Sequence, residues 1–192
     1  MKRFIVIFSI LSLGLLSCEK DQSLDPRPVQ VGGPYMRLDI TSKVLKTKGP
    51  GTNNFTDQEV QDSYFGGLLT DPSGKVVQYK LYVKRRDSYG VGGEFKFVKE
   101  ITSFPTELKV TQQEIADALG LSVSDLVFGD EYYFYAEAFD SVGKRSDYYS
   151  LSTTVQTAPG MKQAFRFRTT SVTKSFFDVA ENYVSYDNYV NP

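Results

Sequence analysis

Two stretches of this chain alternate between apolar and polar residues with a period of two, which predicts β-strands that each bury one face. In VVQYKLYVKRRD (76–87), one face is predicted to carry Val77, Tyr79, Leu81 and Val83, and the other Gln78, Lys80, Tyr82 and Lys84. In DEYYFYAEAFD (130–140), one face carries Tyr132, Phe134, Ala136 and Ala138, and the other Tyr133, Tyr135, Glu137 and Phe139. Such strands must pair into sheets that cover a core.

Further strands are predicted along the chain at intervals of about ten to fifteen residues. They lie at 35–40, in 60–69 with a bulge at Gly66-Gly67, at 94–101, at 148–157 and at 163–172. The run EFKFVKEI (94–101) is expected to pair antiparallel with 76–87. Residues 43–58 are polar and rich in turn formers, which predicts a long loop, and 71–74 (DPSG) predicts a tight turn. The pattern indicates an all-β fold, an antiparallel sandwich.

One short helix is predicted within this all-β pattern. Thr111 and Glu114 have the spacing of a capping box, in which each side chain bonds a backbone N–H at the helix start. Ile115, Ala118 and Leu119 follow at helical spacing, and Gly120 can end the helix in a left-handed conformation. We expect about two turns, inserted before the strand at 131–140.

The composition excludes several kinds of chemistry. The chain has no histidine and a single cysteine, so Ser–His and Cys–His nucleophiles and His/Cys zinc sites are impossible. No phosphate-binding glycine motif follows a strand, and a formal net charge of −1 argues against nucleic acid. We therefore expect no enzyme, cofactor or metal. Asp130, Glu131 and Asp140 are either solvated turn acids or, alternatively, a catalytic carboxylate pair or a calcium site. The acidic group at 57–62 has the same two interpretations.

The tyrosines give the best indication of a binding surface. Several are predicted on strand faces or ends opposite the core, where they could stack on sugars or anchor a partner protein, namely Tyr82, Tyr133, Tyr135, Tyr148 and Tyr149. The alternative is that tyrosine simply suits the second face of a sheet. The basic run Lys84, Arg85 and Arg86 is interpreted as a guard against edge pairing, or else a contact for an acidic partner or glycan.

The N-terminus has the layout of an export signal. Lys2 and Arg3 precede an apolar run from Phe4 to Leu16, which as a helix would reach about 20 Å, short of the roughly 30 Å needed to cross a bilayer. The run ends in LLSC, which resembles the lipobox of bacterial lipoproteins. That resemblance implies cleavage before Cys18 and acylation of its thiol, so that two or three chains anchor the protein in the membrane. Glu19, Lys20 and Asp21 resemble the outer-membrane sorting signals of Bacteroidota-type lipoproteins.

These observations divide the chain into a signal peptide (1–17), a tether rich in proline and glycine (18–33), a β-sandwich (34–175) and a C-terminal strand or tail (176–192). Removal of the leader takes away Lys2 and Arg3 and leaves a formal net charge of −3. A domain without a cysteine after Cys18 must be stabilised by packing.

The segment YYFYAEAFDSVGKRS (132–146) carries a family resemblance. It is similar to the penultimate strand of fibronectin type III and immunoglobulin-like domains, with Ala138, Asp140, Gly143 and Ser146 in the matching places. With the lipobox and the helix, the chain resembles the N-terminal domain of SusE-type outer-membrane lipoproteins, although it is too short for their further glycan-binding domains. The resemblance implies a non-catalytic, lipid-anchored outer-membrane binding or accessory module, as in glycan uptake. The alternative is a structural or adhesive surface lipoprotein that contacts other proteins.

Overall fold

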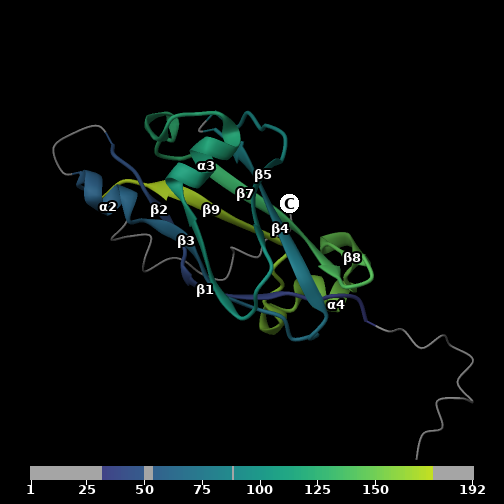
Figure 1. The fold of residues 1–192 in the computed structure, drawn as a ribbon. Coiled ribbons are helices and arrows are strands. Elements are labelled where there is room, and N and C mark those ends of the chain that lie inside the picture. The colour runs from purple at the N-terminus through teal and green to yellow at the C-terminus, as the bar shows by residue number, and fades with distance from the viewer. Residues whose placement is uncertain (1–31, 50–53, 88, 175–192) are drawn as a thin grey trace, which may run out of the picture. The chain divides into compact units, whose positions relative to one another are not determined.

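The computed structural model describes residues 32–49, 54–87 and 89–174 (Figure 1). The chain divides into two compact units, Met1–Gly32 and Gly33–Pro192, and all elements named below belong to the second. The predicted signal peptide, Cys18 and the C-terminal strand or tail at 176–192 lie outside the described residues. None of the helices in the described ranges is long and apolar enough to cross a bilayer.

The strands form two sheets, as the alternating pattern predicts. The first has the order β1-β3-β6 and is antiparallel, with strands Arg37–Ser42, Tyr64–Thr70 and Thr106–Thr111. The second has the order β2-β9-β7-β4-β5, with strands Leu45–Lys46, Arg166–Val172, Glu131–Asp140, Val76–Arg86 and Lys96–Ile101. The short β8 (Arg145–Ser146) also pairs with β7. Every pair is antiparallel except β2–β9, which is parallel.

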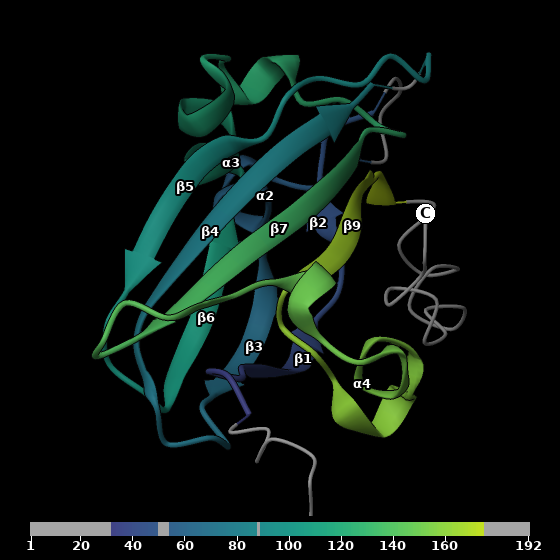
Figure 2. The same cartoon turned by 90° about the vertical axis from the view of Figure 1, so that its right-hand side faces the viewer.

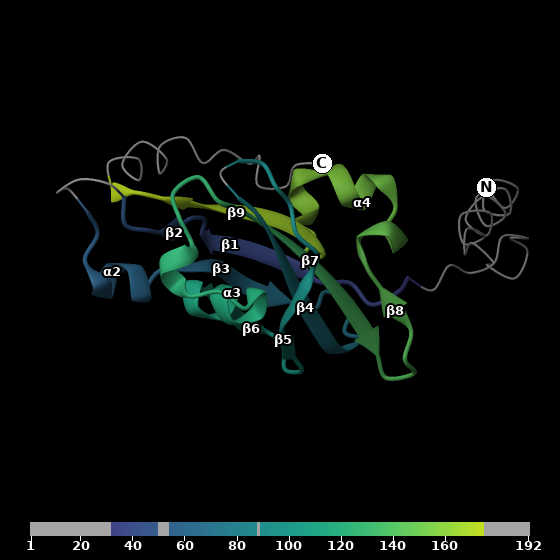
Figure 3. The same ribbon diagram turned by 90° about the horizontal axis from the view of Figure 1, so that it is seen from above.

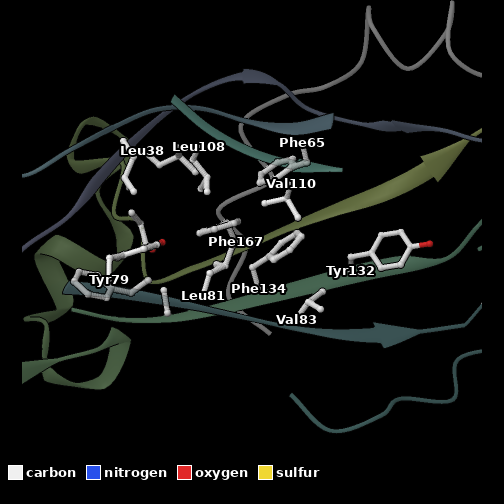
Figure 4. Close-up of a cluster of buried hydrophobic side chains, with 14 of the residues drawn as sticks. Leu38, Phe65, Tyr79, Leu81, Val83, Leu108, Val110, Tyr132, Phe134 and Phe167 are labelled. Atoms are coloured by element: carbon white, nitrogen blue, oxygen red, sulfur yellow. The ribbon is translucent and has the colours of Figure 1, made fainter. Parts of the chain in front are cut away.

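The core lies between the two sheets (Figure 4). Phe65 of β3 stacks against Phe134 of β7 and Phe167 of β9, with ring centroids 5.4 Å away in both cases. Tyr79 is fully buried and its hydroxyl donates to the carbonyl of Ala164, which satisfies its one polar group. Each buried aromatic contributes about 1.5–3 kcal/mol, so this cross-sheet cluster is what holds the layers together.

The predicted faces of the two long strands are confirmed except at one residue. In β7 all the predicted core residues face the core, and in β4 the prediction is correct from Tyr79 onward. The prediction that Val77 of β4 faces the core is wrong. A β-bulge between Val76 and Gln78 turns Val76 inward and leaves Val77 46% exposed.

The Gly66-Gly67 pair sits opposite a bulge and does not itself form one. The irregularity falls in β1 between Ile40 and Ser42, while both glycines keep a regular register with β6. A Cβ on Gly66 would overlap the carbonyl of Leu108, and one on Gly67 that of Asp39. Glycine is needed here because three backbones approach closely.

The predicted helix is confirmed as α3 (Gln112–Leu119). Thr111 and Glu114 form the capping box, and Gly120 ends the helix with φ 69°. Ile115 is buried, and α3 packs against β4, β5 and β6, which places it beside one open edge of the two sheets (Figure 3).

Other short helices correct the sequence-based prediction. The expected loop at 43–58 contains β2 and the start of α2 (Asp57–Gln61), which begins because Thr56 and Glu59 form a second capping box. The strand expected at 148–157 is wrong. That segment forms a 3-10 turn, Tyr148–Ser150, and helix α4 (Thr153–Thr157), capped respectively by Asp147 and Ser152. Two more 3-10 turns are Val123–Asp125 and Pro159–Met161.

Candidate functional site

The outer face of the larger sheet carries aromatic side chains in rows that run across the strands. We call this surface the aromatic face and define it by Tyr82, Phe95, Phe97, Tyr133 and Tyr135. The three tyrosines lie outside because the odd positions of β7 and the even positions of β4 point away from the core. Phe97 of β5 lies opposite Tyr82, and both phenylalanines are exposed. Figure 2 views this side, with β5, β4 and β7 next to one another and the smaller sheet behind them.

Strand register arranges the face in three rows. The first row pairs Arg168 of β9 with Tyr133 of β7, and Tyr133 with Lys84 of β4. The second row consists of Arg166, Tyr135, Tyr82 and Phe97. The third row consists of Glu137, Lys80 and Glu100.

The rings contact one another but do not form a flat shelf. Phe97 meets Tyr82 edge-on with centroids 5.8 Å apart, and Tyr82 is tilted by 44° against Tyr135 at 6.1 Å. Phe95 is tilted by 50° against Tyr135 at 5.7 Å. Phe97 remains 51% exposed and Phe95 41%, while the tyrosines are half-buried. The face therefore offers ring edges and ring surfaces to solvent in a fixed arrangement.

A network of carboxylates bounds one side of the aromatic face. The Tyr82 hydroxyl donates to Glu137 Oε2 at 3.2 Å, and the Tyr135 hydroxyl donates to Asp147 Oδ2 at 3.0 Å. Arg145 bridges the two acids, at 2.9 Å from Glu137 and 3.1 Å from Asp147. These bonds fix the tilt of both tyrosine rings.

The pKa values of these groups follow from that network. Burial raises the pKa of Tyr82, and the negative charge of Glu137 raises it further. Burial and the hydrogen bond to Asp147 raise the pKa of Tyr135. Burial alone would raise the pKa of Asp147, but bonds from Tyr135 and Ser150 and the charge of Arg145 hold it below its usual value. Both hydroxyls therefore stay protonated at neutral pH and donate.

Cations on this face lie over rings. Lys84 Nζ lies 5.0 Å from the centroid of Phe95 and 5.5 Å from that of Tyr133, and Lys80 Nζ lies 5.2 Å from that of Phe139. Arg166 lies over the ring of Tyr148 at 5.1 Å. Each such contact is worth about 0.5–1 kcal/mol at an exposed site.

The structure places three of the five predicted tyrosines together and separates two. Tyr82, Tyr133 and Tyr135 lie on the aromatic face. Tyr148 was expected opposite the core and is instead 7% exposed, because the turn after β8 packs its ring into the core cluster beneath Arg166. Tyr149 is 73% exposed but belongs to the 3-10 turn after β8, outside the rows.

Phe95 and Phe97 complete the face and were not among the predicted site residues. Their alternation was visible in EFKFVKEI, but which side they face depends on the register with β4. That register shifts at a bulge between Leu81 and Tyr82, which sets Phe97 opposite Tyr82. The sequence did contain a usable signal: Tyr82 was predicted to face outward, and the cross-strand neighbours available in the hairpin partner 94–101 include Phe95 and Phe97.

The basic run and the acidic candidates have structural partners. Arg85 does not guard an edge, since β4 is an interior strand. Arg85 pairs with Asp130, which is fully buried rather than a solvated turn acid. Glu131 lies 3.3 Å from Arg86. Asp140 accepts from Val142 N and Lys144 N, which closes the turn before β8.

The acidic group at 57–62 belongs to helix α2 and its ends. Glu59 closes the capping box with Thr56, Asp57 pairs with Lys48, and Asp62 accepts from Gln58. Within the described ranges, no group of three acidic, histidine or cysteine side chains is arranged to hold a metal ion.

Fold and site together define a β-rich domain of two packed sheets with an aromatic, cation-bearing outer face. Comparison with protein-family models, with curated proteins and with solved structures gave no match.

Proposed function

We propose that this chain is a non-catalytic, lipid-anchored outer-membrane module that binds a glycan chain on its aromatic face, as an accessory of glycan uptake. The observation that carries the proposal is the set of cross-strand rows, which bring aromatic rings next to one another and next to charged side chains. Rings of this kind can stack on the apolar faces of sugars, while neighbouring charged groups bond to hydroxyls.

An immunoglobulin or fibronectin type III topology is part of the proposal. The strand order β1-β3-β6 in one sheet and β9-β7-β4-β5 in the other corresponds to A-B-E and G-F-C-C′ in those domains. Helix α3 then falls between E and F, and the resembling segment 132–146 begins in F. This order supports the fold assignment made from the sequence.

The anchor rests on the sequence, because LLSC at 15–18 has the form of a lipobox. The full precursor, expressed in a diderm host, is expected to yield a mature chain that begins at Cys18 and carries fatty acyl chains by mass spectrometry. A Cys18→Ser variant is expected to keep its leader or lose the added mass. A wild-type product without fatty acids would contradict this part of the proposal.

The binding surface is tested with a glycan array probed by the full chain purified in detergent. Wild type is expected to bind, and Tyr82→Ala/Phe97→Ala is expected to bind at least about tenfold more weakly, since two adjacent rings are lost. Tyr89→Ala is the matched control, because Tyr89 is an exposed aromatic in the β4–β5 hairpin and lies outside the rows. Equal loss in all variants, or no binding by wild type, would refute the proposal.

A second candidate, contact with another surface protein, is favoured by the tip of that hairpin. Tyr89 is 92% exposed and Val91 lies beside it, also exposed. β4 ends at Arg86, next to this hairpin. Its other end, Val76, pairs with Asp140, which leads into the β7–β8 turn, and residues of that turn lie close to Gly33. The tip is thus remote from the point where the described chain begins. Cross-linking on whole cells through a photoreactive residue at position 89 would recover such a partner.

A further inference from the structure

We infer that the glycan held by the aromatic face is anionic, a polysaccharide that carries carboxylate or sulfate groups on its sugar rings. This inference rests on the proposed function, and it adds the chemical class of the ligand. It is carried by those cations of the face that contact aromatic rings and have no carboxylate partner among the described residues.

The first step concerns cations that have no counter-ion. Many basic side chains of the described residues lie within 4.0 Å of a carboxylate, among them Arg37, Lys48, Arg85, Arg86, Lys96, Lys99, Lys109, Arg145, Lys162 and Arg168. Lys80, Lys84 and Arg166 have no carboxylate partner in the described part of the chain and contact aromatic rings instead. All three lie on the outer side of the same sheet. Lys80 lies between Glu137 and Glu100 in the strand register, whereas Lys84 and Arg166 lie opposite tyrosines, so the unpaired positive charge is that of Lys84 and Arg166.

The second step compares these cations with the acids around them. Glu137 is already bridged to Arg145 and bonded by Tyr82, and Glu131 is engaged by Arg86 and Tyr133. Glu100 faces Lys80 across the strands without an ion-pair contact. An incoming anion at Lys84 or Arg166 therefore gains an attraction without displacing an existing pair. A charged ligand group binds a partly exposed cation most favourably when it does not have to replace an existing ion pair.

The third step concerns the repeat along the face. Two neighbouring rows each begin with an arginine of β9 followed by a tyrosine of β7, namely Arg168 with Tyr133 and Arg166 with Tyr135. In the first row a second positive charge, Lys84, follows on β4. A polymer whose sugar rings each carry an anionic group presents the complementary alternation of apolar ring face and charge.

A polysaccharide suits this face better than an acidic protein does. The central cores of protein interfaces are depleted of charge, and lysine is depleted throughout them. Here Lys84 lies over Phe95 and Tyr133, two of the five residues that define the aromatic face. A hydrophilic, charged ligand can use this position, whereas an apolar anchor from a protein would have to dehydrate the ammonium group.

The experiment measures binding of the full chain, purified in detergent, to immobilised polygalacturonate, alginate and chondroitin sulfate. Each probe is paired with its own neutral form, carboxyl-reduced or, for the sulfated probe, also desulfated. Poly-glutamate serves as the acidic polypeptide. The variants are Lys84→Gln, Arg166→Gln and the double variant. The matched control is Lys109→Gln, since Lys109 also lies over a tyrosine, Tyr64 at 4.9 Å, but on the other sheet and with Glu107 as counter-ion.

The expected result is binding to at least one acidic polysaccharide and weaker binding to its neutral form. Each single variant should weaken binding about threefold to tenfold, with Lys109→Gln unchanged, and high salt should reduce the affinity of wild type. Equal affinity for charged and neutral forms, with Lys84→Gln unaffected, would overturn the anionic ligand but leave the glycan proposal standing. Binding to poly-glutamate alone, or to no probe, would overturn both.

Discussion

The ion pair between Asp130 and Arg85 should be the most sensitive polar feature of the domain. Asp130 is 0% exposed; its Oδ1 accepts from Arg85 Nη2 at 3.1 Å, and Oδ2 lies 2.9 Å from Arg85 Nε. Oδ2 also accepts from the backbone N–H of Val127 at 2.9 Å and from the Tyr132 hydroxyl. The carboxylate therefore joins β4, β7 and the loop before β7.

The perturbation is Asp130→Asn, which keeps the shape but removes the charge and places an amide donor against other donors. Breaking a buried pair by changing one partner costs about 3–5 kcal/mol. We expect the lower end, about 3 kcal/mol, because the side chain of Arg85 is 21% exposed and water can solvate part of its charge.

The assay is urea unfolding of the purified chain, followed by far-UV circular dichroism. The matched control is Asp140→Asn at the other end of β7, where the amide oxygen can still accept from Val142 N and Lys144 N. Its expected cost is below about 1 kcal/mol. The double variant Arg85→Met/Asp130→Asn should recover part of the loss, because the unpaired cation is gone. A loss under about 1 kcal/mol for Asp130→Asn, or no difference from Asp140→Asn, would refute the reasoning.

Three further predictions concern stability. Phe134→Ala should lower the free energy of unfolding by about 3–5 kcal/mol in the same urea assay, because its ring stacks between the sheets on Phe65, whereas a loss below 1 kcal/mol would contradict that core. Thr111→Ala should cost about 1 kcal/mol through loss of the α3 cap, and an unchanged midpoint would contradict the capping role. Because the pKa of Asp147 is lowered in the folded state, its ionised form stabilises the fold above its unfolded pKa of about 3.9, and that contribution is lost as pH falls through the folded value. The stability gap between wild type and Asp147→Asn should therefore narrow below about pH 4, and a pH-independent gap would contradict the assignment.

The features that the sequence could predict depend on residues close together along the chain. The faces of β4 and β7 follow from a two-residue period, and α3 follows from Thr111 and Glu114, which bond to each other's backbone. The turn at 71–74 is fixed in the same way, by Asp71 accepting from Ser73 N and Val76 N. In each case the physical cause spans a few residues.

The features that escaped prediction depend on contacts between distant segments. Tyr148 looks like an exposed strand residue in YYSLSTTVQT, but it lies in a 3-10 turn and its ring is covered by Arg166 of β9. Asp130 looks like a turn acid until β4 brings Arg85 to it. Membership of the aromatic face depends on a bulge in β5, where Val98 is the extra residue between Phe97 and Lys99. No local pattern indicates this bulge, and Phe97 was therefore not assigned to the site.

Hydroxyl-radical footprinting with mass spectrometry tests most directly whether the outward rings of β4, β5 and β7 are the surface that ligand covers. The full chain would be oxidised with and without a saturating bound polysaccharide from the panel above. The predicted result is strong protection of Tyr82, Phe95 and Phe97, with oxidation of Tyr89 and Tyr149 unchanged. Protection of Tyr89 or Tyr149 alone, with Phe97 oxidised as in the free protein, would contradict the account.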